Sequence, residues 1–123
     1  MTQPLAIVFY ERLMPGSQLV NRLQDLNYHV QSVNNAATLA ATVKREMPLL
    51  LLTDFSADGD IRTAVEKLKA ATATAHLPII AFAPDSQPDL LEAAQKAGAN
   101  IVMGESGITS HLSQLLDQAL HVE

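Results

Sequence analysis

The sequence predicts an α/β fold in which a doubly wound, five-stranded parallel sheet is covered by five helices, giving three layers. Short apolar runs recur along the chain, and segments with apolar residues at helical spacing separate them. A continuous apolar run, as opposed to an alternating one, indicates a strand buried on both faces, which is typical of parallel strands between helices. Residues 1–123 are expected to form one domain, in keeping with the usual size of a single core.

Five segments are expected to form the strands. Four of them are continuous apolar runs, at Leu5–Phe9, Leu49–Leu52, Pro78–Phe82 and Ile101–Met103. The fifth, His29–Val33, alternates apolar and polar residues and is therefore expected at an edge of the sheet. Because helical crossovers between parallel strands are right-handed, the binding crevice is expected at the carboxyl ends of the strands.

Apolar stripes at helical spacing predict the five helices. The stripes are Leu19, Leu23 and Leu26; Leu39, Val43 and Met47; Ile61, Val65 and Leu68; Leu90, Ala94 and Ala97; and Ile108, Leu112, Leu115 and Ala119. Pro48 blocks extension of the second helix, and Gly98 is expected as a left-handed C-cap of the fourth. Asp85 or Ser86 is expected to cap the start of the fourth helix.

Composition excludes several classes of function. Eight Lys and Arg against thirteen Asp and Glu give a net charge of −5, and the cations are scattered, which disfavours nucleic-acid binding. The chain has no cysteine, so thiol catalysis, cysteine-ligated metals and disulfides are excluded. The N-terminus lacks a basic signal region, and no apolar stretch approaches the roughly 18 residues of a membrane span. We therefore expect a cytoplasmic protein that does not enter a membrane.

Asp54 is the ionisable residue that follows a fully apolar run at the expected crevice. A carboxylate in that place is partly desolvated, which makes it a candidate nucleophile or a group that needs a partner. Alternatively, Asp54 is a turn residue, because the segment 54–60 contains the Asp and Gly residues that turns favour.

The order of these segments resembles the receiver domain of two-component response regulators, which has a CheY-like, flavodoxin-like fold. The resemblance rests on residues 48–54, on 67–69 followed by 75–80, and on 93–100, and it extends over essentially the whole chain. Receivers accept a phosphoryl group on the aspartate that ends the third strand. The resemblance therefore implies Asp54 as the phosphoacceptor candidate.

Several positions depart from the receiver pattern. The two acidic residues that hold Mg²⁺ in the family correspond to Phe9 and Tyr10, with Glu11 one place further along. The family's Thr or Ser at the end of the fourth strand corresponds to Ala83, and its Lys after the fifth strand to Glu105. Phosphoryl transfer depends on a metal and on cations around the transferred oxygens, so we expect a degenerate pseudo-receiver without the Mg²⁺-dependent cycle.

Two further pocket positions complete the comparison with the family. Val102 takes the place of the aromatic residue that moves with the switch, and Ser56 follows the acceptor in its loop. Ser56 also belongs to the segment from Asp54 to Gly59, which matches the first half of an EF-hand loop. Val65 stands where that loop requires a bidentate acid, so calcium binding is not favoured.

Other roles for the acidic residues stay open. If the first strand is shifted by one or two residues, Glu11, Asp54 and Glu105 could form a three-carboxylate cation site. Asp54 and Glu105 could also serve as the general acid and base of a small enzyme, because two neighbouring carboxylates acquire different proton affinities. The sequence offers no substrate-positioning group for such an enzyme.

The leading hypothesis is a non-catalytic signalling domain that binds a protein partner or a second copy of itself. By resemblance, the contact face comprises the fourth helix, the fifth strand and the fifth helix. Its outer residues are Gln95, Lys96, Thr109, His111, Gln114 and Gln118. No cofactor, nucleic acid or membrane is expected as a ligand. The alternative is a working receiver phosphorylated on Asp54 in a phosphorelay.

Overall fold

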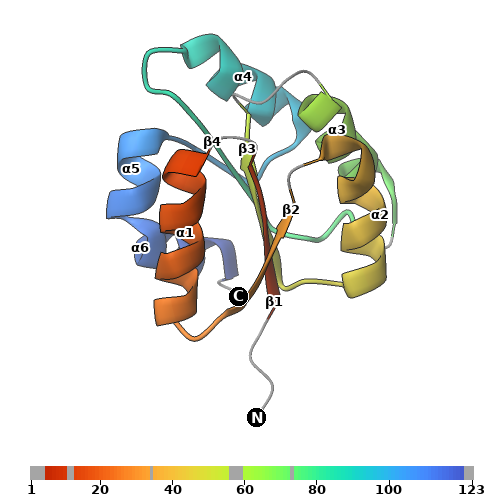
Figure 1. Ribbon diagram of the computed structural model, residues 1–123. Helices are drawn as coiled ribbons and strands as arrows, with labels where there is room; N and C mark the ends of the chain where they lie inside the picture. The colour runs from red at the N-terminus through yellow and green to blue at the C-terminus, as the bar shows by residue number, and fades with distance from the viewer. Residues whose placement is uncertain (1–4, 11–12, 34, 56–59, 73, 121–123) are drawn as a thin grey trace.

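Five parallel strands form the central layer, and helices cover both of its faces (Figure 1). The computed structural model describes residues 5–10, 13–33, 35–55, 60–72 and 74–120. The strands are β1 (Leu5–Phe9), β2 (His29–Val33), β3 (Leu50–Asp54), β4 (Ile79–Ala83) and β5 (Ile101–Gly104). The helices are α1 (Leu13–Asp25), α2 (Ala36–Glu46), α3 (Asp60–Ala70), α4 (Pro88–Ala97), α5 (Glu105–Ser110) and α6 (Leu112–Leu120).

The strand order β2-β1-β3-β4-β5 confirms the predicted doubly wound sheet. The chain winds outward from β1 in one direction to β2 and in the other to β3, β4 and β5. The topological switch point therefore lies between β1 and β3, where ligands of such sheets bind outside the carboxyl ends of the strands.

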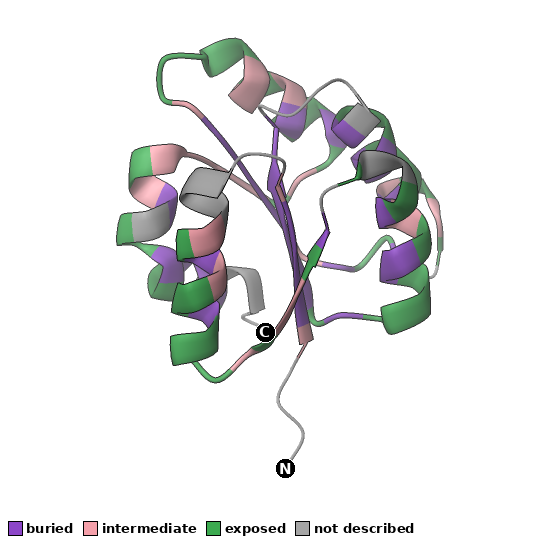
Figure 2. Cartoon of the chain, in the orientation of Figure 1, coloured by how far each residue is buried: buried purple, intermediate pink, exposed green. Residues whose placement is uncertain are grey.

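Alternate residues of the strands build two separate apolar cores. Leu51 packs with residues of α2, α3 and α4 on one face of the sheet, whereas Leu50 and Leu52 pack with residues of α1, α5 and α6 on the other. The central strands are buried throughout (Figure 2). Continuous apolar runs therefore do mark the central strands, because each strand must fill both cores.

The edges of the sheet differ from the expectation in part. The alternating strand β2 is an edge strand, as predicted. The run Ile101–Met103 was expected to be buried on both faces, but β5 is half-buried along its whole length because it pairs with β4 alone. Leu49 does not belong to β3 and is 45% exposed, since the strand begins at Leu50.

The helix ends also refine the prediction. Leu26 lies beyond α1 and Met47 beyond α2, and both are exposed, so they do not extend the buried stripes. Gly98 is the expected left-handed C-cap of α4, at φ 114°. The N-cap of α4 is Gln87, not Asp85 or Ser86, and its side chain makes no capping hydrogen bond.

The predicted fifth helix is interrupted at His111, giving α5 and α6. His111 has φ −122° and ψ 25°, outside the helical region, although its N–H still bonds to the Gly107 carbonyl at 2.9 Å. Leu115 resumes the helical pattern by bonding to the His111 carbonyl at 3.0 Å. None of the helices in the described ranges is long and apolar enough to cross a membrane.

A polar network ties helix α3 to two loops at the amino-terminal edge of the sheet. Lys69 Nζ donates to the carbonyls of Leu77 at 2.8 Å and Ala75 at 3.3 Å, and to Asn100 Oδ1 at 2.7 Å. Asn100 Oδ1 also accepts the N–H of Ile79 at 3.0 Å. Burial lowers the pKa of Lys69. One amide oxygen therefore joins α3, the start of β4 and the loop before β5.

Candidate functional site

Asp54 ends β3 at the carboxyl edge of the sheet, where the sequence places it. It pairs with Phe82 of β4, and the next residue, Phe55, continues the ladder by donating its N–H to the Phe82 carbonyl at 2.8 Å. The Asp54 side chain is 0% exposed. A carboxylate in that position is inside the protein, and a reactant in solvent does not contact it in this conformation.

Phe9 and Tyr10 lie beside this aspartate, but their side chains belong to different cores. Phe9 pairs with Thr53, is fully buried, and packs in the core under α2, α3 and α4. Tyr10 is half-buried against the other core, and its N–H bonds to the Val33 carbonyl at 3.0 Å. The first-strand register therefore places Phe9 and Tyr10 at the carboxyl edge, as expected, although the Phe9 ring is core and not the lining of a cleft.

Ala83 and Val102 occupy the predicted places in β4 and β5. Ala83 is fully buried, and the half-buried Val102 packs against the same core as Phe9. Ala83 supplies a methyl group where receivers carry a hydroxyl. Thr53 Oγ1 is buried on this edge and has no hydrogen-bond partner among the described residues.

Two of the predicted pocket residues, Glu11 and Ser56, lie outside the described residues, as do Asp58 and Gly59. The three-carboxylate site and the EF-hand-like segment therefore stay as sequence expectations. Within the described ranges, no three His, Asp or Glu side chains come together as a set that could hold a metal ion.

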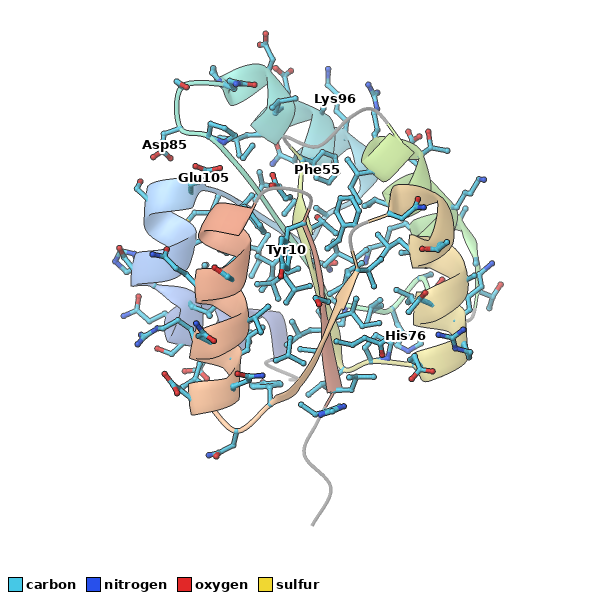
Figure 3. The ribbon with its side chains drawn as sticks, in the orientation of Figure 1. Tyr10, Phe55, His76, Asp85, Lys96 and Glu105 are labelled. Carbon is cyan, nitrogen blue, oxygen red and sulfur yellow. The ribbon has the colours of Figure 1, made fainter. Side chains whose placement is uncertain are left out.

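A second carboxylate joins Glu105 at this end of the molecule. The β4–α4 loop turns at Pro84, whose carbonyl accepts the Gln87 N–H at 2.9 Å, and it brings Asp85 over Gly104. Asp85 Oδ1 occupies the space that a Cβ at residue 104 would need, and Asp85 Cγ would lie 2.8 Å from that atom. In Figure 3 the labelled side chains of Asp85 and Glu105 both lie toward the upper end of α5.

Sequence reasoning missed this role of Asp85, which was expected to cap α4. The signal available was Gly104 itself, because a glycine within a strand often marks a close approach of another part of the chain. The contact also explains why Asp85 does not cap α4: its carboxylate is directed toward β5. The half-buried Glu105 makes a contact of its own within the protein.

No protein-family profile matches the sequence, and no curated protein matches it. Solved structures do match. A Chloroflexus aurantiacus protein assigned as a response regulator superposes with a TM-score of 0.88 at 18% identity, covering 97% of this chain and 98% of its own. The receiver domain of the sensor histidine kinase PA1611 from Pseudomonas aeruginosa gives 0.86 at 18%, with coverage of 97% and 98%.

The chemotaxis response regulator CheY4 of Vibrio cholerae superposes with a TM-score of 0.82 at 14% identity, covering 97% of this chain and 100% of its own. The chain has the receiver fold. At such low identity the likeness establishes the fold alone. In the receiver fold of this chain, Asp54 ends the third strand, which is the position that the sequence resemblance gives to the phosphoacceptor.

The face expected to contact partners surrounds β5 in this receiver fold. Gln95 and Lys96 are exposed on α4, and His111 and Gln114 are exposed where α5 gives way to α6. Thr109 and Gln118 lie within α5 and α6, and their side chains are outside the described part. Lys96 pairs with Glu92 one turn earlier, at 3.3 Å.

Proposed function

We propose that this chain is a receiver-like signalling domain that acts through protein–protein contact and does not use the Mg²⁺-dependent phosphorylation cycle. The burial of Asp54 is the observation that carries the proposal. In-line phosphoryl transfer requires the attacking oxygen to come within about 3 to 3.5 Å of the reacting phosphorus. A carboxylate with 0% exposure meets no phosphodonor unless the surrounding structure opens.

The groups around Asp54 are also poorly suited to Mg²⁺ and to a phosphoryl group. One structural neighbour, the PA1611 receiver domain, was solved with magnesium in its active-site cleft. Mg²⁺ requires oxygen ligands in near-octahedral geometry, whereas Phe9 contributes a buried ring and Ala83 a methyl group. Asp85 and Glu105 add negative charge on the side where a transferred phosphoryl group needs cations.

The partner-binding part of the proposal rests on the edge strand β5. Ile101, Val102 and Met103 are apolar and only half-buried, and β5 has one strand neighbour. Exposed polar residues of α4 and of the α5–α6 junction flank this strand. A partly apolar strip with a polar rim is the usual anatomy of a protein–protein interface, so this face suits another protein domain or a second copy.

A phosphorylation assay tests directly whether the chain uses the Mg²⁺-dependent phosphorylation cycle. We expect incubation with acetyl phosphate and Mg²⁺ to add no phosphoryl mass to the intact protein, as measured by mass spectrometry. Asp54→Asn is the matched control, because it keeps the side-chain shape and removes the nucleophile. A mass gain of one phosphoryl group in the parent that is missing in Asp54→Asn would overturn the proposal in favour of a working phosphoacceptor.

The contact face can be tested in cells that naturally contain the protein. We expect a photo-crosslinking amino acid in place of Lys96 to give a defined adduct, whose mass distinguishes a second copy from another protein. Arg62 is the matched control position, because it is also an exposed cation that pairs with a glutamate one turn away, but on α3. Equal crosslinking at both positions, or none at Lys96, would contradict the assignment of this face.

A further inference from the structure

The segment between α2 and β3 presents two apolar side chains to solvent, away from the face around β5. Met47 is 59% exposed and Leu49 is 45% exposed. A hollow beside Met47 is lined by Val43, Met47, Pro48, Thr74, His76 and Leu77. Figure 3 shows His76 at the foot of α2, at the end of the sheet opposite Glu105. We call the hollow together with Leu49 the α2–α3 base.

The backbone of Met47 adopts an unfavourable, left-handed conformation. It has φ 52°, in the left-handed region, and its N–H bonds to the Val43 carbonyl at 2.9 Å, so it closes the last turn of α2. Glycine normally fills this position, because a Cβ is costly at positive φ. A large apolar side chain that is both strained and exposed contributes little to folding, which points to a role in recognition.

The charge around the α2–α3 base is opposite in sign to that of the whole chain. The last turn of α2 carries Lys44 and Arg45, and that of α3 carries Lys67 and Lys69, in a protein with a net charge of −5. Arg45 is engaged by Glu46 at 3.0 Å, and Lys69 by Asn100. Lys44 and Lys67 are exposed, and neither forms an ion pair with a residue that the structure describes.

We propose that the α2–α3 base binds an acidic segment of a partner protein through one apolar side chain flanked by carboxylates. The apolar side chain packs against the exposed Met47 and Leu49, and the carboxylates pair with Lys44 and Lys67. Apolar burial provides the affinity, and the local positive charge selects acidic segments and accelerates their association. This surface is separate from the face around β5. A negative result for partner binding at one surface therefore does not affect the proposal for the other.

The first experiment is an NMR titration of the ¹⁵N-labelled protein with a short peptide of Glu and Asp residues around two leucines. We expect saturable shifts confined to residues 43–49, to Lys67 and its neighbours in the last turn of α3, and to residues 74–77. Two control peptides separate the contributions: one has serine for leucine, and the other has lysine for the acidic residues. Binding of the lysine peptide with equal affinity would overturn the proposal, as would shifts that lie elsewhere or none.

Variants then assign the binding to named side chains. We expect Met47→Gly, and the double charge reversal Lys44→Glu with Lys67→Glu, each to weaken peptide binding about tenfold or more. Met47→Gly should fold at least as well as the parent, because glycine suits φ 52°, and its melting temperature provides that check. Arg22→Glu, on exposed α1 across the sheet, is the charge control and should leave binding unchanged.

Two other occupants are tested with the same samples. Binding of the parent to vesicles of anionic lipid, lost in Met47→Gly, would replace the acidic segment with a membrane surface and overturn the proposal. Self-association in sedimentation velocity that is lost in Met47→Gly would overturn it in favour of a second copy. A monomer that binds the acidic peptide and ignores the vesicles is the result that we expect.

Discussion

Replacing Phe9 with aspartate is expected to destabilise the protein by about 4 kcal/mol or more, although an acidic residue is what receivers carry at this position. The Phe9 ring is fully buried in the core under α2, α3 and α4. The substitution removes its apolar contacts and leaves a carboxyl group in their place. Urea unfolding followed by circular dichroism measures the difference directly.

Two control variants separate the possible causes of a loss of stability in Phe9→Asp. Phe9→Leu keeps an apolar side chain of similar size and should cost about 1.5 kcal/mol or less, which separates the effect of charge from that of volume. Tyr10→Asp places the acid one residue later, at a half-buried position, and should be much better tolerated. If Phe9→Asp retained the stability of the parent within about 1 kcal/mol, the ring would not be the core element described above.

The stability of Phe9→Asp also shows whether position 9 can accept a carboxylate. A stable Phe9→Asp variant would place a carboxylate at the carboxyl edge of the sheet by a single exchange. The packing of Phe9 predicts instead that the exchange removes part of the core, because neighbouring side chains have closed around the ring. The aromatic residue at position 9 is then part of the packed core and not a local feature of the surface.

Asn100→Ala is expected to cost about 2 to 3 kcal/mol, a large effect for a residue in an exposed loop. Asn100 Oδ1 accepts hydrogen bonds from Lys69 Nζ at 2.7 Å and from the Ile79 N–H at 3.0 Å. Alanine leaves the N–H at the start of β4 unsatisfied next to the fully buried Ile79 side chain. It also removes one of the three acceptors around Lys69.

Asn100→Asp is the matched control, because it keeps the acceptor oxygens and adds a charge opposite to that of Lys69. We expect its stability at neutral pH to equal or exceed that of the parent. The pairing depends on an ionised carboxylate, so its contribution is present above the unfolded-state pKa of aspartate and is lost as the pH falls through the lower folded-state value. Equal loss in both variants at neutral pH would show that the amide oxygen does not organise these loops.

The candidate site could be predicted from the sequence as a set of positions. The length of each apolar run and the spacing between runs place Asp54 and Ala83 at strand ends and Glu105 directly after a strand, and the structure has them there. Such places follow from local patterns, because a strand end is marked by the residues next to it. The roles proposed for these residues in signalling stay predictions.

Contacts between these positions could not be predicted in the same way. The approach of Asp85 to Gly104 depends on how the β4–α4 loop folds over a neighbouring strand, and no periodicity encodes that path. The exposure of Met47 was missed for a related reason, since its place in an apolar stripe holds only while the helix continues. One left-handed residue before Pro48 ends the helix and turns the side chain outward.

The sequence by itself determined the parallel sheet, the helices that cover it and the position of one aspartate, because burial on two faces requires consecutive apolar residues that can be read along the chain. The tertiary structure alone decided that Phe9 is core, that β5 is a half-buried edge and that the Asp85 side chain reaches Gly104 of β5. Those features arise between segments distant in sequence, where strand order and loop path, and not local composition, set which side chains meet.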